Sequence, residues 1–283
     1  MVTSRTSLWT EYKSARELTL NLTLRELKGK YKRSVLGWTW SLLNPLATIA
    51  IFALVFRFFL KIPAPPGHPS GAHNFALFLV AALLPWNYLN NGLNGSMGAL
   101  VGNANLIKKV YFPREALVVS NVASWAYSLL IEFAVAAVVY LAFGNMVLPW
   151  LPVVLVLIAI QSLFVLGLGL LLSVLNVYFR DVQHLINILL LVWFYATPIV
   201  YPPSYVEQAN ASHPELFGHV IPVLSLYRLN PMVRLVGAYR NVLYDLRFPS
   251  MFDVAYVLVW GLVTLAFGLW IFRRLQGRVA EEL

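Results

Sequence analysis

A dense basic run leads directly into a long apolar stretch near the amino-terminal end, and this junction constrains the fold more than any other feature. From position 25 to position 45 the sequence reads RELKGKYKRSVLGWTWSLLNP, and apolar residues continue to Leu60. A bilayer core about 30 Å thick is crossed by roughly 20 helical residues, which positions 38–60 supply. Basic residues before a span favour the cytoplasmic side, and tryptophans such as Trp38 and Trp40 favour the headgroup boundary. The junction predicts a membrane span, although a solvated basic helix leading into a buried core helix has the same pattern.

The composition places the whole chain in the membrane class. Of its 283 residues, 59% are hydrophobic and only 12% are charged, about half the charged fraction of a soluble domain. We expect one membrane domain over residues 38–283, preceded by a cytoplasmic interface segment over residues 1–37. Because the first thirty residues carry charge throughout, we expect no signal peptide. The absence of cysteine excludes disulfides and thiolate metal sites.

Apolar segments predict an all-α integral membrane protein with six transmembrane helices. Residues 7–27 come before them and show apolar positions at helical spacing, with most charges off that stripe. This segment is too polar to span, so it predicts an amphipathic helix on the cytoplasmic interface, or one packed on a partner. The predicted spans are residues 38–60, 75–100, 116–143, 151–177, 182–201 and 254–272.

The distribution of basic residues predicts the orientation of these spans. Of the 21 lysines and arginines, fifteen fall on one side, which by the positive-inside rule is cytoplasmic together with both termini. Orientation thus explains the net charge of +9, and no nucleic-acid partner is needed. The six basic residues elsewhere are Arg57, Lys61, Arg228, Arg234, Arg240 and Arg247.

Between the fifth and sixth spans, two moderately apolar pieces lie around residues 221–226 and 232–243. Each is too short to cross a bilayer. They predict re-entrant or interfacial helices on the outer face, within a segment of about residues 217–248.

Polar residues inside the second span predict an irregular helix that lines something wet. Pro85 removes one backbone donor from this helix, and polar groups at membrane depth must face protein or a watery cavity. The asparagines after it are Asn87, Asn90, Asn91 and Asn94. The aromatic residues concerned are Trp86 and Tyr88 on the second span, and Trp193, Phe194 and Tyr195 before Thr197 and Pro198 on the fifth.

Two charged residues are expected at membrane depth. Glu132 in the third span is a functional candidate or a structural hydrogen-bonding group, since a carboxylate there costs about 2.5–3.5 kcal/mol unless it is paired or protonated. Arg57 lies near the outer end of the first span. Its side chain either snorkels outward or faces a passage.

Enzyme chemistry is missing from the sequence. No G-x-x-x-x-G-K-[ST] loop is present, so we expect no nucleotide site on this chain. The five histidines are scattered, the serines form no nucleophile motif, and the spans lack a run of buried acids. We therefore predict no catalytic residues, no metal site and no cofactor, and we expect any energy for transport to come from another chain.

Four stretches in the same order resemble the membrane subunits of ABC exporters for lipid-linked polysaccharides and teichoic acids. These stretches read LRELKGKYKRSVLGWTWSLLNPL, LIKKVYFPREALVVS, NVYFRDVQHLINILLLVWFYATPIVY and LYRLNPMVRLVGAYR. The resemblance implies a permease in the bacterial cytoplasmic (inner) membrane, formed as a homodimer over two ATPase subunits that bind ATP and Mg²⁺. Arg57 departs from the small or apolar residue expected at its position.

The resemblance also implies roles for two cytoplasmic elements. The amphipathic helix and the loop between spans two and three would touch the ATPase, while Arg180 and Asp181 form the inner turn before the fifth span. For this pair, a gate contact and a plain helix cap are both open. The residues implied in ATPase coupling are Lys108, Lys109, Tyr111, Phe112, Pro113, Arg114 and Glu115.

A hydrated polysaccharide needs hydroxyl partners and flat apolar faces along its path, and the second and fifth spans offer both. We therefore predict a conduit formed by Pro85, Trp86, Asn87, Tyr88, Asn91, Trp193, Phe194, Tyr195, Thr197 and Pro198. Interfacial anchoring or core packing is the alternative for any single aromatic residue. For the whole chain, the alternatives are an integral-membrane glycan-modifying transferase and an ABC permease for drugs or small lipids.

Overall fold

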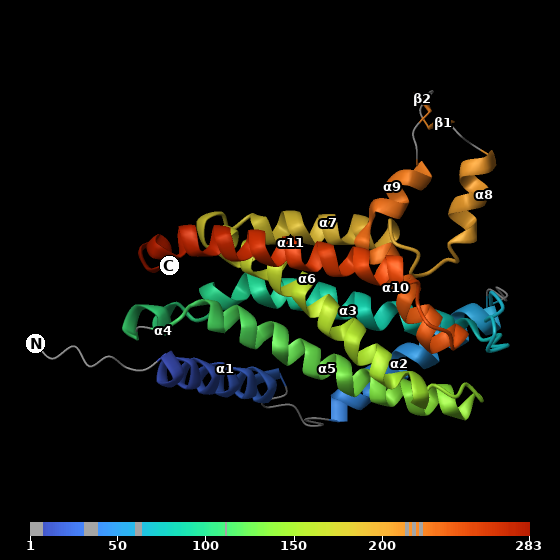
Figure 1. Cartoon of the computed structure of the whole chain (residues 1–283), viewed down its shortest axis with the longest axis horizontal. Helices are drawn as coiled ribbons and strands as arrows, with labels where there is room; N and C mark the ends of the chain where they lie inside the picture. Colours follow the sequence, from blue (N-terminus) through green and yellow to red (C-terminus); the bar gives the residue numbers. More distant parts are fainter. Residues whose placement is uncertain are drawn as a thin grey trace, which may run out of the picture.

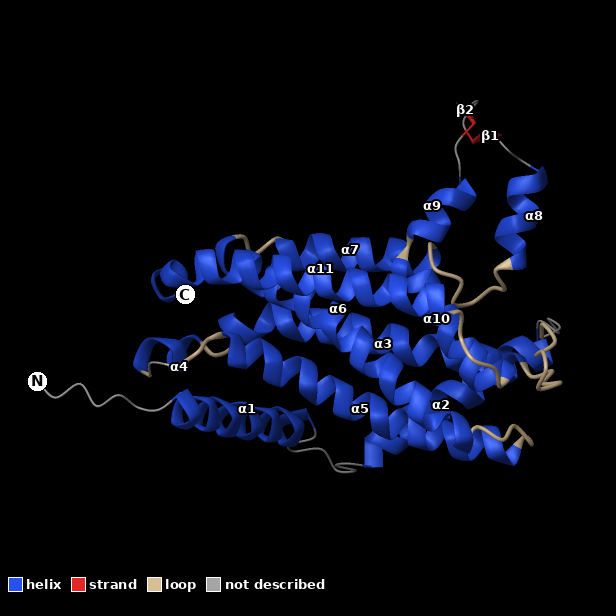
Figure 2. Ribbon diagram, viewed as in Figure 1, coloured by secondary structure: helices blue, strands red, loops and turns tan. Residues whose placement is uncertain are grey.

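The protein is an elongated helical bundle, as Figures 1 and 2 show. The only strands in the described part are two-residue segments, β1 (Glu215–Leu216) and β2 (His219–Val220), which pair antiparallel. The predicted all-α class is therefore confirmed. The computed structural model describes residues 8–30, 39–59, 64–110, 112–212, 215–216, 219–220 and 223–283.

Helices occupy all six segments that the apolar runs predict. The first is α2 (Trp40–Phe52), which continues as the π-helical turn η2 (Ala53–Phe59). The others are α3 (Phe75–Val101), α5 (Glu115–Ala142), α6 (Leu151–Tyr178), α7 (Val182–Tyr195) and α11 (Met251–Leu275).

Length and composition qualify three helical stretches as spans: Glu115–Ala142, Leu148–Tyr178, which includes the turn η3 (Leu148–Trp150), and Met251–Glu282. Two shorter apolar helices cover Leu42–Val55 and Val182–Tyr195. The protein therefore has the helices of a membrane protein, while the count of six crossings and the cytoplasmic termini stay predictions.

Two details differ from expectation. The second span is not irregular, because α3 runs without a break through Pro85. The side-chain amide of Gln161 on α6 donates to the carbonyl oxygen of Pro85 at 2.7 Å, so a neighbouring helix supplies a polar partner beside the proline. The fifth span is shorter than predicted, since α7 ends at Tyr195 and a turn follows.

Close packing around α6 holds the bundle together. This helix contacts α3, α5 and α11. Gly167 on α6 and Gly268 on α11 lie backbone to backbone, because a Cβ on either glycine would clash with main-chain atoms of the other helix. Glycines allow membrane helices to approach this closely, which maximises their dispersion contacts.

The two ends of the bundle differ in construction. Short elements gather at the end that holds the carboxyl terminus: α4 (Ala104–Lys109), the turn η5 (Gln276–Arg278) and α12 (Val279–Glu282). Alongside α5 lies α1 (Leu8–Lys30), which buries Leu22 and Leu27. In this structure α1 packs on α5 of its own chain, while its position on the cytoplasmic interface stays a prediction.

The opposite end carries the outer segment. Its elements are α8 (Ser204–Ser212), the strand pair, α9 (Val223–Leu229), α10 (Pro231–Arg240) and the π-helical turn η4 (Asn241–Asp245). The elements from α8 to α9 project away from the bundle. In contrast, α10 packs against α3, α6 and α11. The two predicted short helices correspond to α9 and α10, and α8 was not foreseen.

Candidate functional site

An open pocket of about 380 Å³ lies between α3 and α7 and has an aromatic and amide lining. Three predicted conduit residues, Trp86, Phe194 and Tyr195, come together in it. The remaining lining residues are Asn90, Asn94, Asn187, Leu190 and Leu191.

Helical periodicity explains how this lining forms. Trp86, Asn90 and Asn94 recur every four residues on α3 and therefore share one face. The side-chain amide of Asn94 donates to the Oδ1 of Asn90 at 3.0 Å, which orders the polar part of this face. Asn187 was missed by the sequence analysis, yet it lies seven residues before Phe194, two turns away on the same face of α7.

The aromatic rings of the site pack edge to face. The ring centroid of Trp86 lies 5.5 Å from that of Phe194 and 6.1 Å from that of Trp193. These are favourable aromatic geometries, which add about 0.5–1.5 kcal/mol per pair beyond burial. Trp86 is almost fully buried, whereas Tyr195 is 61% exposed. The cluster is therefore a fixed wall with one accessible ring at its edge.

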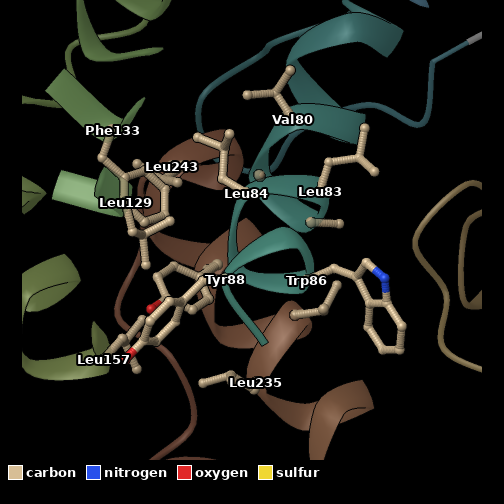
Figure 3. Close-up of a cluster of buried hydrophobic side chains, with 14 of the residues drawn as sticks. Val80, Leu83, Leu84, Trp86, Tyr88, Leu129, Phe133, Leu157, Leu235 and Leu243 are labelled. Carbon is tan, nitrogen blue, oxygen red and sulfur yellow. The ribbon is translucent and has the colours of Figure 1, made fainter. Parts of the chain in front are cut away.

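Other predicted conduit residues lie elsewhere. Tyr88 projects from the opposite side of α3 to Trp86, toward Leu157 and Leu235 (Figure 3), and its hydroxyl is 2.8 Å from Ser162 Oγ. In this chain Tyr88 is a core residue, so its predicted contact with a passage is not supported. The half-buried Asn87 and Asn91, like the buried Pro85, are outside the pocket lining.

Thr197 and Pro198 form the buried turn that ends α7. Asn230, the residue before α10, holds this turn by donating to Thr197 Oγ1 at 3.1 Å and accepting from the indole nitrogen of Trp193 at 2.8 Å. The outer segment is thus bonded directly to the aromatic wall of the pocket.

The predicted coupling residues lie at the end with the carboxyl terminus. On α4, Ile107 is buried while Lys108 and Lys109 are exposed. Phe112 packs partly into the adjacent core, and the guanidinium of Arg114 donates to the carbonyl oxygen of Gln276. Pro113 and Glu115 complete this loop and the start of α5, and Tyr111 lies outside the described residues.

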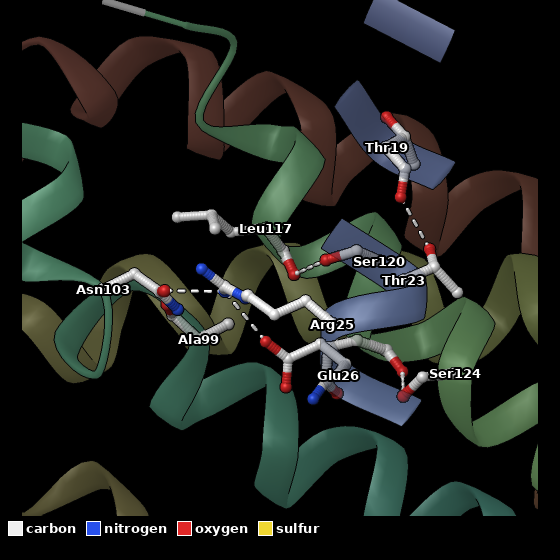
Figure 4. A network of polar contacts seen from close by, with 10 residues as sticks. Thr19, Thr23, Arg25, Glu26, Ala99, Asn103, Leu117, Ser120 and Ser124 are labelled. Carbon is white, nitrogen blue, oxygen red and sulfur yellow. Dashed lines mark hydrogen bonds and ion pairs between the residues drawn. The ribbon is translucent and has the colours of Figure 1, made fainter. Parts of the chain in front are cut away.

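A polar contact joins the amphipathic helix to this loop. Arg25 on α1 donates to Asn103 Oδ1 at 2.7 Å and to Glu26 Oε1 at 3.0 Å, as Figure 4 shows. Asn103 is the residue before α4. The two elements that the resemblance assigns to ATPase contact therefore form one connected surface.

Lys30 anchors the far end of α1 on α5. Its ammonium donates to Ser128 Oγ at 2.9 Å and to the carbonyl oxygen of Ser124 at 3.1 Å, and lies 3.4 Å from the ring centroid of Trp125. Burial lowers the pKa of Lys30 to about 7, and the negative charges of Glu132 and Glu26 oppose this shift. Glu132 thus lies within electrostatic reach of α1.

The remaining predicted residues are less informative. Asp181 precedes α7, but its side chain makes no capping hydrogen bond, because its backbone is already helical. Of the two alternatives for this pair, the structure does not support the helix cap, and a gate contact of the exposed Arg180 and Asp181 stays a prediction. The side chain of Arg57 lies outside the described residues. Among described residues, no group of three or more His, Asp or Glu side chains forms a metal-ligand cluster.

Comparison with known proteins decides the family. A family model described as "ABC-2 type transporter" matches residues 17–211, more than half of the chain. The chain belongs to the ABC-2 type transporter family.

Relatives of this ABC-2 chain are export permeases. It is 32% identical over 253 residues to the O-antigen export system permease protein RfbA of Myxococcus xanthus, covering 87% of this chain and 89% of the relative. It is 28% identical over 271 residues to the protein of the same name from Klebsiella pneumoniae, covering 94% and 95%. The polysialic acid transport protein KpsM of Escherichia coli is 25% identical over 261 residues, covering 89% and 91%.

These likenesses settle the broad class. The ABC-2 chain is an integral membrane transport subunit rather than an enzyme, and its family implies partnership with an ATP-binding ABC subunit.

Proposed function

We propose that this ABC-2 chain is the permease subunit of an ATP-driven exporter that carries a lipid-linked polysaccharide across the bacterial cytoplasmic membrane. Its relatives are named for O-antigen export, polysialic acid transport and capsule polysaccharide export. The glycan belongs to this broad class, which also includes galactans and teichoic acids.

The pocket between α3 and α7 carries the proposal. Sugar rings present flat C–H faces that stack on aromatic side chains, and their hydroxyls exchange hydrogen bonds with amides. The exposed ring of Tyr195, backed by Trp86 and Phe194, provides the first kind of contact, and Asn90, Asn94 and Asn187 provide the second. A contact worth about 1 kcal/mol per ring holds a polymer without trapping it, so successive sugars can exchange places on the same wall.

We infer that two copies of the chain enclose the passage. The pocket is open, and α7, which forms one of its walls, exposes several apolar side chains. A 14-residue helix spans only about 21 Å, less than a bilayer core of about 30 Å. The helix α7 with its terminal turn therefore lines only part of the passage, and a facing copy would complete the lining. The exposed apolar residues on α7 are Leu185, Ile188, Leu189, Leu191 and Val192.

The energy comes from two ATP-binding subunits, which hold ATP and Mg²⁺ outside this chain. The connected surface of α1 and the α4 loop supports this arrangement, since Arg25 and Asn103 tie the two predicted contact elements together.

Depletion of the chain in its own cells tests the function. We expect lipid-linked glycan to accumulate on the cytoplasmic side and to disappear from the cell surface. Unchanged surface glycan together with retention of a drug or small lipid would favour the alternative permease class.

A further inference from the structure

The helix α11 carries an open groove of about 710 Å³ near its carboxyl end. Its lining combines two guanidinium groups, one indole ring and two apolar side chains. The lining residues are Ala266, Leu269, Trp270, Arg273 and Arg274. All five come from α11, and none of them lines the pocket between α3 and α7. The groove is therefore a separate surface feature on one face of the last span.

An apolar stripe continues the groove along α11. Val259, Val263 and Phe267 follow one another at four-residue spacing and are each at least half exposed, so they share one face with Trp270. The helix rises by about 16 Å from Val259 to Trp270, close to half of a bilayer core of about 30 Å. The stripe therefore matches the length of the acyl chains in one leaflet.

Positive charge gathers where this stripe ends. The Cζ atom of Arg274 lies 5.6 Å from the ring centroid of Trp270, within the range of a cation–π contact. The side chain of Arg273 is 68% exposed, and its Nε lies 4.0 Å from Oε1 of Glu115. Glu115 supplies one negative charge against two positive ones, so a net positive charge is left. Tryptophan favours the headgroup level of a bilayer, and guanidinium groups bind phosphate oxygens through paired hydrogen bonds.

We propose that this groove binds one anionic phospholipid, with its phosphate on Arg273 and Arg274 and an acyl chain along the apolar stripe. Charge complementarity selects this occupant. A second copy of the chain, related by a two-fold axis along the membrane normal, would bring the same arginines of both copies face to face. A phospholipid neutralises their charge and covers the stripe. The site goes beyond the proposed function, because it takes a lipid of the bilayer and not the exported glycan.

Native mass spectrometry of the purified protein, released from detergent micelles, tests this site. The protein receives equal amounts of phosphatidylglycerol, which is anionic, and phosphatidylcholine, which carries no net charge, and the ratio of the two bound lipids is measured. The test variant is Arg273→Gln/Arg274→Gln. The matched control is Lys108→Gln/Lys109→Gln on α4, which removes two exposed positive charges at the same end of the molecule.

A basic residue at an anionic lipid surface favours binding about five-fold, so two such residues favour it roughly thirty-fold. Because Glu115 offsets part of the charge of Arg273, we expect the wild type to bind phosphatidylglycerol over phosphatidylcholine by about ten-fold. We expect the arginine variant to bind the two lipids equally within about two-fold, and the lysine control to keep the wild-type ratio. Thermal unfolding of each variant checks that the fold is intact.

Equal binding of the two lipids by the wild type would overturn the site. Loss of the preference in the lysine control would also overturn it, because the preference would then follow the total charge and not the groove. A further arm adds a polyprenyl diphosphate at the same concentration, and displacement of phosphatidylglycerol by this compound would assign the groove to a glycan carrier lipid instead. The proposed function stands under each of these results, since glycan accumulation in depleted cells tests it separately.

Discussion

Substitution Gly268→Ala should separate α6 from α11. The new Cβ would lie 2.9 Å from the carbonyl carbon of Gly167 and 3.2 Å from its Cα, whereas carbon atoms pack at about 3.5–4.0 Å. The carbonyl oxygen of Gly167 lies closer still, so the helices must move apart by at least roughly 0.6 Å, because main-chain atoms cannot rotate away. A gap of about this size forfeits a quarter or more of the dispersion energy of the atom pairs around it.

Overpacking of this kind costs about 1–3 kcal/mol. Since the clash involves backbone on both helices, we expect the upper part of that range and a Tm lower by roughly 5–10 °C. The assay is thermal unfolding in detergent micelles at one detergent concentration. Gly277→Ala is the matched control, since a Cβ there meets nothing within 4 Å. Equal Tm values for Gly268→Ala, the control and the wild type would refute the close packing of α6 and α11.

Three further perturbations address α1, the outer segment and the coupling loop. Burial lowers the pKa of Lys30 from 10.5 to about 7 when α1 is docked on α5. Between pH values of about 7 and about 10, Lys30 therefore carries a proton in the undocked state that it lacks in the docked state. Docking of α1 should strengthen as the pH rises through this range. Spin labels on α1 and α5 of this cysteine-free chain measure it. Lys30→Met should abolish the pH dependence, and weaker docking at higher pH would reverse our sign. Asn230→Ala should cost about 1–3 kcal/mol by leaving the indole of Trp193 unpaired, with faster hydrogen exchange in α10; unchanged exchange would contradict the link. Tyr111→Ala/Phe112→Ala should weaken ATPase binding without altering topology, and retained binding and export would exclude the loop as the coupling element.

Apolar runs alone predict where the helices lie. The bounds of α3 and α6 each fall within one residue of the predicted spans, because burial in a bilayer demands an uninterrupted apolar segment. The end of α7 was predicted six residues too late. Apolar residues continue there, but Asn230 stabilises a turn at Thr197, a contact between distant parts of the chain.

The candidate site was only partly predictable. Trp86 and Tyr88 look equivalent in the sequence, yet two positions on a helix point about 200° apart, so only one can face the pocket while the other meets Ser162. The stripe of Trp86, Asn90 and Asn94 was available from spacing. The position of Asn187 opposite that stripe depends on how α3 and α7 pack, and no local pattern encodes it.

Glycan export through the pocket is measured most directly in inverted membrane vesicles that contain the chain and its ATP-binding subunit. Asn187→Leu/Tyr195→Leu removes two exposed polar or aromatic pocket contacts on α7, and Trp260→Leu on the exposed face of α11 is the matched control. We predict ATP-dependent uptake of lipid-linked glycan by wild type and control, and about ten-fold slower uptake by the double variant with its ATP hydrolysis retained. Uptake by the double variant at the wild-type rate would contradict the role of this pocket in export.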